Sequence, residues 1–228
     1  MLTVPTNVNL KFQGTIGGVG FLAPILDLAD SSDFLLQTSM LNREGYESFQ
    51  MQFNNIRRLA AQEDKRLQAV LLLLRTIFTS ETEHTLFQNL TLYNSHASPL
   101  YTERPQSMLK SFYFANLSQF KKAIHAGENA TIEYANQTLI FRLALDWLED
   151  ITEKVQYVLN RTRVLFYNGQ LDALFPSTKS QAYYEKLNWT YAKEYQEAIR
   201  TLWKPYADLQ TPFGTTLPTS AAGYIKSA

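Results

Sequence analysis

The sequence predicts an α/β protein in which a few parallel strands flank a long helical segment. Residues 163–172 place a run of apolar, strand-forming side chains ahead of Asn168-Gly169 and a carboxylate. An apolar run without polar alternation is typical of a parallel strand that is covered on both faces. Residues 8–16 alternate apolar and polar side chains and predict a second strand. Because roughly 145 mostly helical residues separate the two runs, a helical insertion fits better than an ordinary crossover.

Between and after these strands, apolar residues recur at the three-to-four spacing of helices. The first strand runs into Gly17, Gly18 and Gly20, which predict a tight turn, since their spacing matches neither glycine motif for binding phosphate. The patterns predict helices over 33–41, 46–74, 108–125, 139–158, 177–187 and 191–203, and loops over 79–101 and 212–219.

Composition narrows the function classes. The 228 residues carry 21 basic and 21 acidic side chains, so the formal net charge is zero and the basic footprint of a nucleic-acid-binding protein is missing. The longest apolar run, residues 67–74, is far shorter than the about 20 residues of a membrane helix, so we expect no membrane span. With no cysteine, and with three histidines that lack a metal-binding spacing, the sequence predicts no metal site and points to no cofactor.

Six asparagines satisfy the N-x-S/T rule for N-linked glycosylation, whereas about two would be expected by chance. This excess predicts passage through the secretory pathway, although secreted domains often carry cysteines and this sequence has none. Residues 1–6 have no signal-peptide character, so we expect that the sequence is incomplete at its front. The acceptors are Asn89, Asn116, Asn129, Asn136, Asn160 and Asn188.

Asp172 is the candidate catalytic residue, because functional side chains in open α/β sheets collect where strands end. From the residues alone, an Asp shortly after Asn-Gly is more often a turn or capping residue. His84 and His96 fall in a polar stretch and are expected on the solvated surface. His125 is expected at a helix end, where a cation is favourable. The tryptophans are expected to pack in the core, namely Trp147, Trp189 and Trp203.

Three segments resemble serine carboxypeptidases. Residues 164–172, Val-Leu-Phe-Tyr-Asn-Gly-Gln-Leu-Asp, resemble the strand and loop that carry the triad aspartate in this family. Residues 187–204 match the family's pattern of a Trp, a short acidic-aromatic step and a second Trp-Lys. Residues 9–24 are similar to its NLKG-x-x-IG-x-G…P segment, although Val19 replaces the usual Asn or Asp between glycines. The similarity is closest to the vitellogenic-like carboxypeptidases of animals.

The resemblance implies a partial α/β-hydrolase fold with a large helical cap insertion. It also implies that peptide or protein C-termini are the substrate, and that amino acids are released through an acyl-enzyme. Asp172 would be the acid of a Ser-His-Asp triad. The implied parts are a core strand with its glycine turn over 7–30, a mainly helical cap insertion over 31–160, and a second core segment with the acid loop over 161–228.

The family's catalytic motifs are missing from the sequence. It contains no G-E-S-Y-[AG]-G nucleophile elbow, no N-G-G-P-G segment and no G-G-G-H or G-A-G-H strand. We therefore expect an incomplete chain without its own nucleophile and base, which is inactive by itself.

Two alternatives remain open. In the first, the chain is a catalytically inactive homologue that either binds peptides or proteins or pairs with a full-length carboxypeptidase. A homodimer is also left open. An unrelated helical interaction domain would require the segment around Val164 to be helical, which β-branched runs ending in Asn-Gly disfavour. The resemblance and the glycosylation acceptors together imply a lysosomal or secreted protein.

Overall fold

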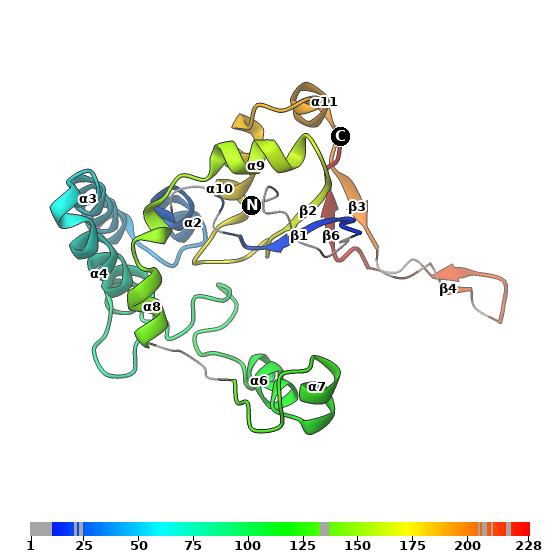
Figure 1. Cartoon of the computed structure of the whole chain (residues 1–228), viewed down its shortest axis with the longest axis horizontal. Helices are drawn as coiled ribbons and strands as arrows, with labels where there is room; N and C mark the ends of the chain where they lie inside the picture. The colour runs from blue at the N-terminus through cyan, green and yellow to red at the C-terminus, as the bar shows by residue number, and fades with distance from the viewer. Residues whose placement is uncertain are drawn as a thin grey trace.

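Figure 1 shows the chain as a computed structural model, which describes residues 11–20, 22, 25–132, 137–204, 206, 209–210, 212–217 and 220–228. The start of the first predicted strand, residues 8–10, lies outside the described residues, as does the glycosylation acceptor Asn136.

The two predicted strands pair in parallel. Strand β1 (Gly14–Gly18) lies beside β2 (Arg163–Tyr167), with Ile16 opposite Leu165 (Figure 1). A Cβ atom at Gly14 would lie 2.5 Å from the carbonyl oxygen of Arg163, so the close approach of the two backbones requires glycine at this position. The parallel pairing confirms the α/β prediction and rules out the helical interaction domain, since the segment around Val164 is a strand.

The expectation that β2 is covered on both faces is wrong for one face. Phe166 is half-buried, and its ring stacks on Tyr184 of α10 (Ser177–Lys186), with the ring centroids 5.2 Å apart. On the other face, Leu165 and Tyr167 are 56% and 60% exposed. An apolar run shows that a strand suits burial, but it does not show which neighbours cover each face.

A hairpin of two long helices contributes much of the core. Helix α3 (Arg43–Ala60) begins after Asn42, whose Oδ1 accepts a hydrogen bond of 2.7 Å from the amide of Gly45. It packs against α4 (Arg66–Ile77), so the pattern over 46–74 covers two helices separated by the short 3₁₀ helix η1 (Glu63–Lys65). Their buried side chains meet those of α1 (Ile25–Ala29) and α2 (Ser32–Gln37), and the largest are Phe49, Phe53, Ile56, Leu73 and Ile77.

The predicted loop over 79–101 contains a helix, α5 (Leu86–Thr91). A capping box explains its stability, because the hydroxyl of Thr85 accepts a bond from the amide of Gln88 and the Gln88 side chain accepts one from the amide of Thr85. The polar composition of the region favours a loop, whereas the Thr-x-x-Gln spacing favours the start of a helix, and the structure follows the spacing.

The prediction of one continuous amphipathic helix over 139–158 is wrong. The structure has α8 (Gln137–Leu143), the 3₁₀ helix η3 (Asp146–Leu148) and α9 (Thr152–Leu159). At Glu149 the backbone becomes extended, and its carboxylate lies 2.5 Å from a guanidinium nitrogen of Arg66 on α4. The helical pattern is thus interrupted on both sides of η3, although the apolar periodicity of the sequence continues.

Other helix predictions hold in part. Residues 108–125 form η2 (Gln106–Leu109), α6 (Lys110–Ala115) and α7 (Ser118–Ala123) rather than one helix. The helix predicted over 191–203 stops early, because α11 (Ala192–Glu197) gives way to β3 (Thr201–Trp203), which pairs antiparallel with β6 (Gly223–Ile225). The predicted loop over 212–219 contains β5 (Thr216–Leu217), which pairs with β4 (Leu209–Gln210).

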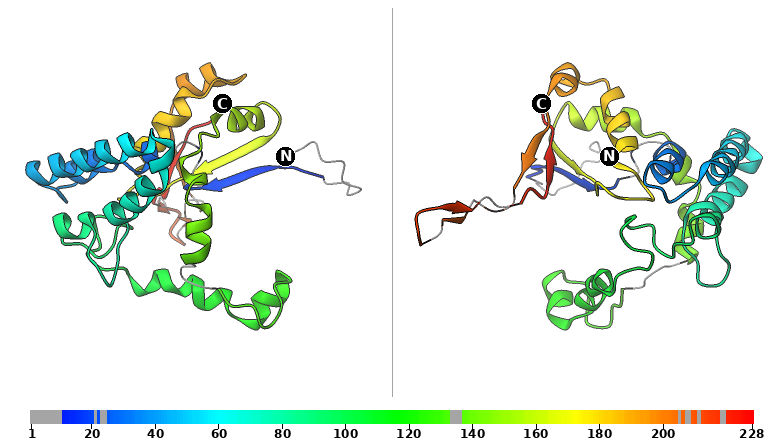
Figure 2. Two further views of the ribbon diagram at one scale, coloured as in Figure 1. Left: turned by 60° about the vertical axis from the view of Figure 1, so that its left-hand side comes forward. Right: turned by 180° about the vertical axis from the view of Figure 1, so that it is seen from behind.

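Two parts of the chain lie apart from the main core. Helices α6 and α7 lie below the core helices in all three views (Figures 1 and 2). The β4–β5 hairpin projects on the side away from α3 and α4 in Figure 1 and in the right-hand view of Figure 2. Across the residues that the structure describes, no helix is both long and apolar enough to cross a membrane.

Candidate functional site

Asp172 lies in the loop that leaves the carboxyl end of the parallel pair. Strand β2 ends at Tyr167, and residues 168–171 turn the chain before Asp172. The next three residues, Ala173, Leu174 and Phe175, are buried and join the hydrophobic core of α1 to α4. The loop is therefore anchored on its far side by packing, while its near side is fixed by the sheet.

The carboxylate of Asp172 is held by the backbone. Its Oδ1 accepts hydrogen bonds from the amides of Leu174 and Phe175, both over 2.9 Å. Burial raises the pKa of Asp172, and the two backbone donors oppose that rise without cancelling it. The two bonds confirm the capping interpretation of Asp172, and its catalytic role stays a prediction.

Helix α10 fixes the turn before Asp172. The side-chain amide of Asn168 donates to the hydroxyl of Ser180 over 2.8 Å, and the hydroxyl of Tyr184 donates to Asn168 Oδ1 over 3.4 Å. Burial raises the pKa of Tyr184 to about 12, so its hydroxyl stays protonated and able to donate at neutral pH. The sequence reasoning did not identify Ser180 and Tyr184, because only the fold brings them to Asn168.

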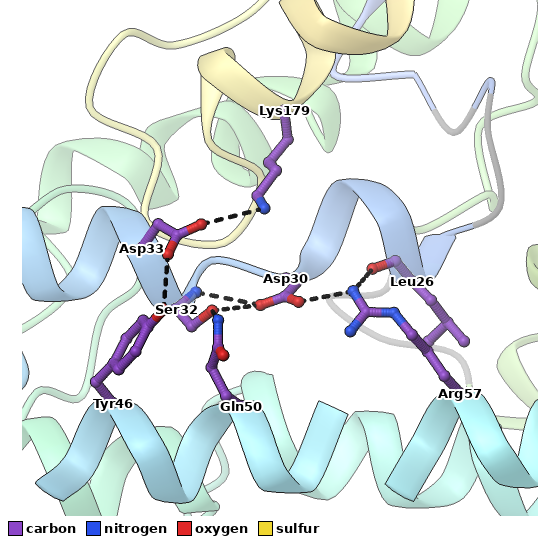
Figure 3. Close-up of polar contacts among 8 residues, drawn as sticks. All are labelled: Leu26, Asp30, Ser32, Asp33, Tyr46, Gln50, Arg57 and Lys179. Carbon is purple, nitrogen blue, oxygen red and sulfur yellow. Dashed lines mark hydrogen bonds and ion pairs between the residues drawn. The ribbon is translucent and has the colours of Figure 1, made fainter. Parts of the chain in front are cut away.

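A polar network ties the start of the helical segment to α10 (Figure 3). Asp30 is 6% exposed, and its Oδ2 lies 2.6 Å from a guanidinium nitrogen of Arg57 on α3. Its Oδ1 accepts a bond of 2.6 Å from the hydroxyl of Ser32. Next to it, Asp33 pairs with Lys179 of α10 over 3.6 Å. The helix that follows the Asp172 loop is thus linked to α2 and, through this network, to α3.

The prediction that His96 is a solvated surface residue is wrong. Its ring packs edge-on against Phe78 and Phe87, with centroid distances of 6.1 Å and 6.4 Å. Burial, with a smaller contribution from the charge of Arg104, lowers the pKa of His96 to about 4. The carbonyl of His96 also accepts a bond of 3.1 Å from the amide of Ala173, so its loop rests on the Asp172 loop.

The other candidate residues lie as follows. His84 is exposed, and His125 follows α7 with a positive φ of 56°, at the helix end where it was expected. Of the tryptophans, Trp147 packs against the core. Trp203 is 46% exposed, because it lies on β3, a surface strand. The prediction that it packs in the core is therefore wrong. Within the described ranges, no donation from a histidine ring reaches Asp172, and no cluster of three metal-ligand residues occurs.

Exposure of the glycosylation acceptors agrees with accessibility to modification. All five that the structure describes are on the surface, namely Asn89, Asn116, Asn129, Asn160 and Asn188.

Replacing Asp172 separates its charge from its capping role. Asp172→Ala is expected to lower the free energy of unfolding at pH 7 by about 1–2 kcal/mol, because two buried amides lose their acceptor. Asp172→Asn keeps the accepting oxygen. Since the folded pKa is raised, the charged form loses stability as pH rises through that pKa, so Asn should match or slightly exceed the wild type at pH 7. Urea denaturation of the three proteins checks both outcomes; equal loss in both variants would contradict them.

Asn168→Ala is expected to cost about 1 kcal/mol and to loosen the acid loop. The matched control is Ser180→Ala, which removes only the partner hydroxyl and should cost less. Hydrogen exchange at the amides of Leu174 and Phe175 is the measurement, and unchanged protection in Asn168→Ala would show that the Asn168 bonds do not hold the loop.

A parallel strand pair with a carboxylate beyond its carboxyl edge, in a chain otherwise rich in helices, is typical of α/β proteins, in which functional side chains follow the ends of parallel strands. The family model for serine carboxypeptidase matches residues 3–226, and the chain belongs to the serine carboxypeptidase family, which implies the α/β-hydrolase fold.

Individual relatives agree. The chain is 28% identical over 204 residues to venom serine carboxypeptidase of Apis mellifera, covering 88% of this chain and 43% of that protein. It is 25% identical over 224 residues to probable serine carboxypeptidase CPVL of Homo sapiens, covering 97% and 44%. It is 23% identical over 199 residues to vitellogenic carboxypeptidase of Aedes aegypti, covering 86% and 41%. The chain thus spans less than half the length of these relatives.

Proposed function

We propose that the chain supplies the orienting acid of a serine-type carboxypeptidase that acts on peptide or protein C-termini. The observation that carries the proposal is the backbone-held carboxylate of Asp172 beyond the carboxyl end of β2. In such a site, a serine attacks the terminal peptide carbonyl, a histidine takes the serine proton, and the aspartate holds the histidine ring and stabilises its charge. An aspartate that moves cannot hold that ring, so an acceptor already fixed by two amides suits the role.

The nucleophile and the base would come from residues outside these 228. The sequence lacks the family's serine elbow and histidine strand, and the histidines of the described segments lie at other places. Because nucleophile and base act as a unit, Asp172 alone gives no rate enhancement, so we propose that the chain by itself is inactive.

A fluorophosphonate probe, which labels activated serines, tests this proposal together with hydrolysis of blocked dipeptides. The chain alone is expected to show neither labelling nor release of a C-terminal amino acid, whereas an active serine carboxypeptidase treated in parallel should show both. Covalent labelling of the chain would overturn the claim that it carries no nucleophile. A longer product that contains these residues should be active and should lose roughly 10⁴-fold in kcat with Asp172→Asn.

The exposed side of the sheet favours a second candidate, a catalytically inactive homologue that binds another polypeptide. Ile16, Leu165 and Tyr167 lie on one face of the β1–β2 pair and are 74%, 56% and 60% exposed. Apolar faces of this kind are usually covered in a native assembly. A monodisperse, cooperatively unfolding chain would support the binding role or a homodimer, and aggregation through the strand edges would count against it.

We also propose passage through the secretory pathway, to a lysosomal or secreted location. The support is the excess of glycosylation acceptors, of which the five described ones are exposed. Expression behind a secretion signal, followed by enzymatic removal of N-glycans, should show a stepwise loss of mass; a chain without N-glycans would contradict the proposal.

A further inference from the structure

Two of the glycosylation acceptors share one local arrangement. Asn116 ends α6 and Asn160 ends α9, and each side-chain amide donates to the carbonyl four residues earlier, at Phe112 over 3.0 Å and at Gln156 over 2.9 Å. Each side-chain carbonyl accepts a backbone amide from a distant segment, which is Ile132 for Asn116 over 3.1 Å. Because both ends of each amide are hydrogen-bonded, the two side chains have a fixed direction.

Asn160 is held more firmly than Asn116. Its Oδ1 accepts both the backbone amide of Thr190 over 2.8 Å and the hydroxyl of Thr190 over 2.7 Å. Thr190 is also the hydroxyl residue of the neighbouring acceptor motif at Asn188. Asn160 is nevertheless an exposed residue.

A surface hollow lies beside each of the two asparagines. Asn160 itself lines an open hollow of about 380 Å³, together with Phe12, Arg161 and Tyr191. Phe12 and Tyr191 are 56% and 54% exposed, and the Tyr191 ring is braced edge-on by Trp189, with centroids 5.8 Å apart. Exposed aromatic faces beside hydrogen-bonding side chains suit a sugar ring, whose C–H face packs on an aromatic ring while its hydroxyls reach polar groups.

The hollow at Asn116 is smaller. Its volume is about 240 Å³, and it is lined by Leu109, Phe112, Tyr113 and Ile132. Asn116 bonds to the backbones of two of these residues, Phe112 and Ile132, so its amide lies at the edge of the hollow. Tyr113 is 72% exposed there.

We propose that Asn160 and Asn116 carry N-glycans whose first sugars pack into these hollows and become part of the folded surface. The inference rests on one part of the proposed function, passage through the secretory pathway. It does not rest on Asp172 or on any hydrolytic activity. It selects two acceptors from the six as sites of ordered glycans and assigns the aromatic residues that hold them.

The chemistry leaves the observed hydrogen bonds intact. In the transfer, the Asn160 amide nitrogen forms a bond to the anomeric carbon of a lipid-diphosphate-linked oligosaccharide. The bond from that carbon to the diphosphate oxygen breaks, the lipid diphosphate leaves with the electron pair, and the amide nitrogen loses one proton to a base of the transferase. The product keeps one N–H to donate to Gln156 and its carbonyl oxygen to accept from Thr190.

The test uses the full chain secreted from a eukaryotic host. Mass spectrometry of glycopeptides gives the occupancy of each acceptor, and peptide-N-glycosidase treatment of the native protein gives the release rate of each glycan. Release at Asn160 and Asn116 is expected to be on the order of tenfold slower than at Asn129, an exposed turn residue that lines neither hollow, because the enzyme needs local opening to reach a packed sugar. After denaturation the three rates should agree.

Variants of the residues that line the hollow distinguish a glycan that packs into it from one that is merely attached at Asn160. Phe12→Ala combined with Tyr191→Ala should bring release at Asn160 to the rate at Asn129 and leave Asn116 slow. Thr162→Ala removes the Asn160 acceptor motif without touching Asn160 and should lower the melting temperature of the secreted protein, whereas Thr162→Ser keeps both motif and temperature. Thr162→Ala also removes the hydrogen bond from the Thr162 hydroxyl to the Val158 carbonyl. The same variants made in bacteria, where no glycan is added, measure the effect of losing that bond alone.

Three results would overturn the inference: an unoccupied Asn160, equal native release at Asn160 and Asn129, or slow release that survives loss of both aromatic rings. None of them depends on peptidase activity. A chain that fails as part of a carboxypeptidase but shows slow release at Asn160 would refute the proposed function and support the glycan site.

Discussion

Replacing Arg57 with alanine is expected to lower the free energy of unfolding by about 3 kcal/mol. Arg57 is the charged partner of Asp30, whose side chain is 8% exposed, and the two lie 2.6 Å apart (Figure 3). Removing one member of such a pair leaves a buried charge without its partner, which costs more than the pair contributes when intact. We place the value at the lower end of the usual range because the Arg57 side chain is itself 39% exposed.

Arg58→Ala is the matched control for Arg57→Ala. Arg58 lies on the same helix but is exposed, and its guanidinium donates to the Asn55 side chain over 2.9 Å, so its loss should change stability by less than about 0.5 kcal/mol. The double variant Asp30→Ala with Arg57→Ala should lose less than the sum of the two single losses, since no buried charge remains. Urea unfolding followed by circular dichroism measures the wild type, the three single variants and the double variant. An Arg57→Ala protein as stable as the wild type would show that the charge of Asp30 is satisfied without the guanidinium.

The local features of the site were predictable from the sequence. Four strand-forming residues followed by Asn-Gly specify a strand and a sharp exit wherever the segment lies, so β2 and the Asp172 loop were found from a window of ten residues. The parallel partner was also found, although β1 continues through Gly18 rather than ending at Ile16. These elements depend on backbone preferences that are carried by neighbouring residues.

The missed features depend on contacts between distant residues. His96 is partly buried against Phe78 and Phe87 and beside the loop at Ala173, and no local pattern shows that these segments meet. The Arg66–Glu149 pair at the break between η3 and α9 likewise joins segments that no local pattern relates. The α5 helix is different, since its Thr85–Gln88 capping box is a local pattern that the sequence itself contains.

Acidification from pH 7 to pH 4 is expected to destabilise the fold through His96 by roughly 3 kcal/mol, since its pKa falls from 6.5 in the unfolded chain to about 4 in the fold. A lowered folded pKa means that the neutral form is the stable one, so this contribution is fully present above pH 6.5 and is lost as pH falls toward 4. Protonation places a charge between Phe78 and Phe87, near Arg104, and the loop that supports Ala173 has to open to hydrate it.

His96→Gln should therefore flatten the stability profile between pH 6.5 and pH 4, even if it lowers stability at pH 7 by loosening the aromatic contacts. His84→Gln, at an exposed position in the same stretch, should leave the profile unchanged. Urea midpoints at half-unit pH steps give the slope of stability against pH for each protein. Asp172 acts in the opposite direction, because its raised pKa adds stability as pH falls through that pKa. A His96→Gln profile as steep as the wild type would mean that the histidine is already solvated, and that the loop on which the Asp172 segment rests is not sensitive to acid.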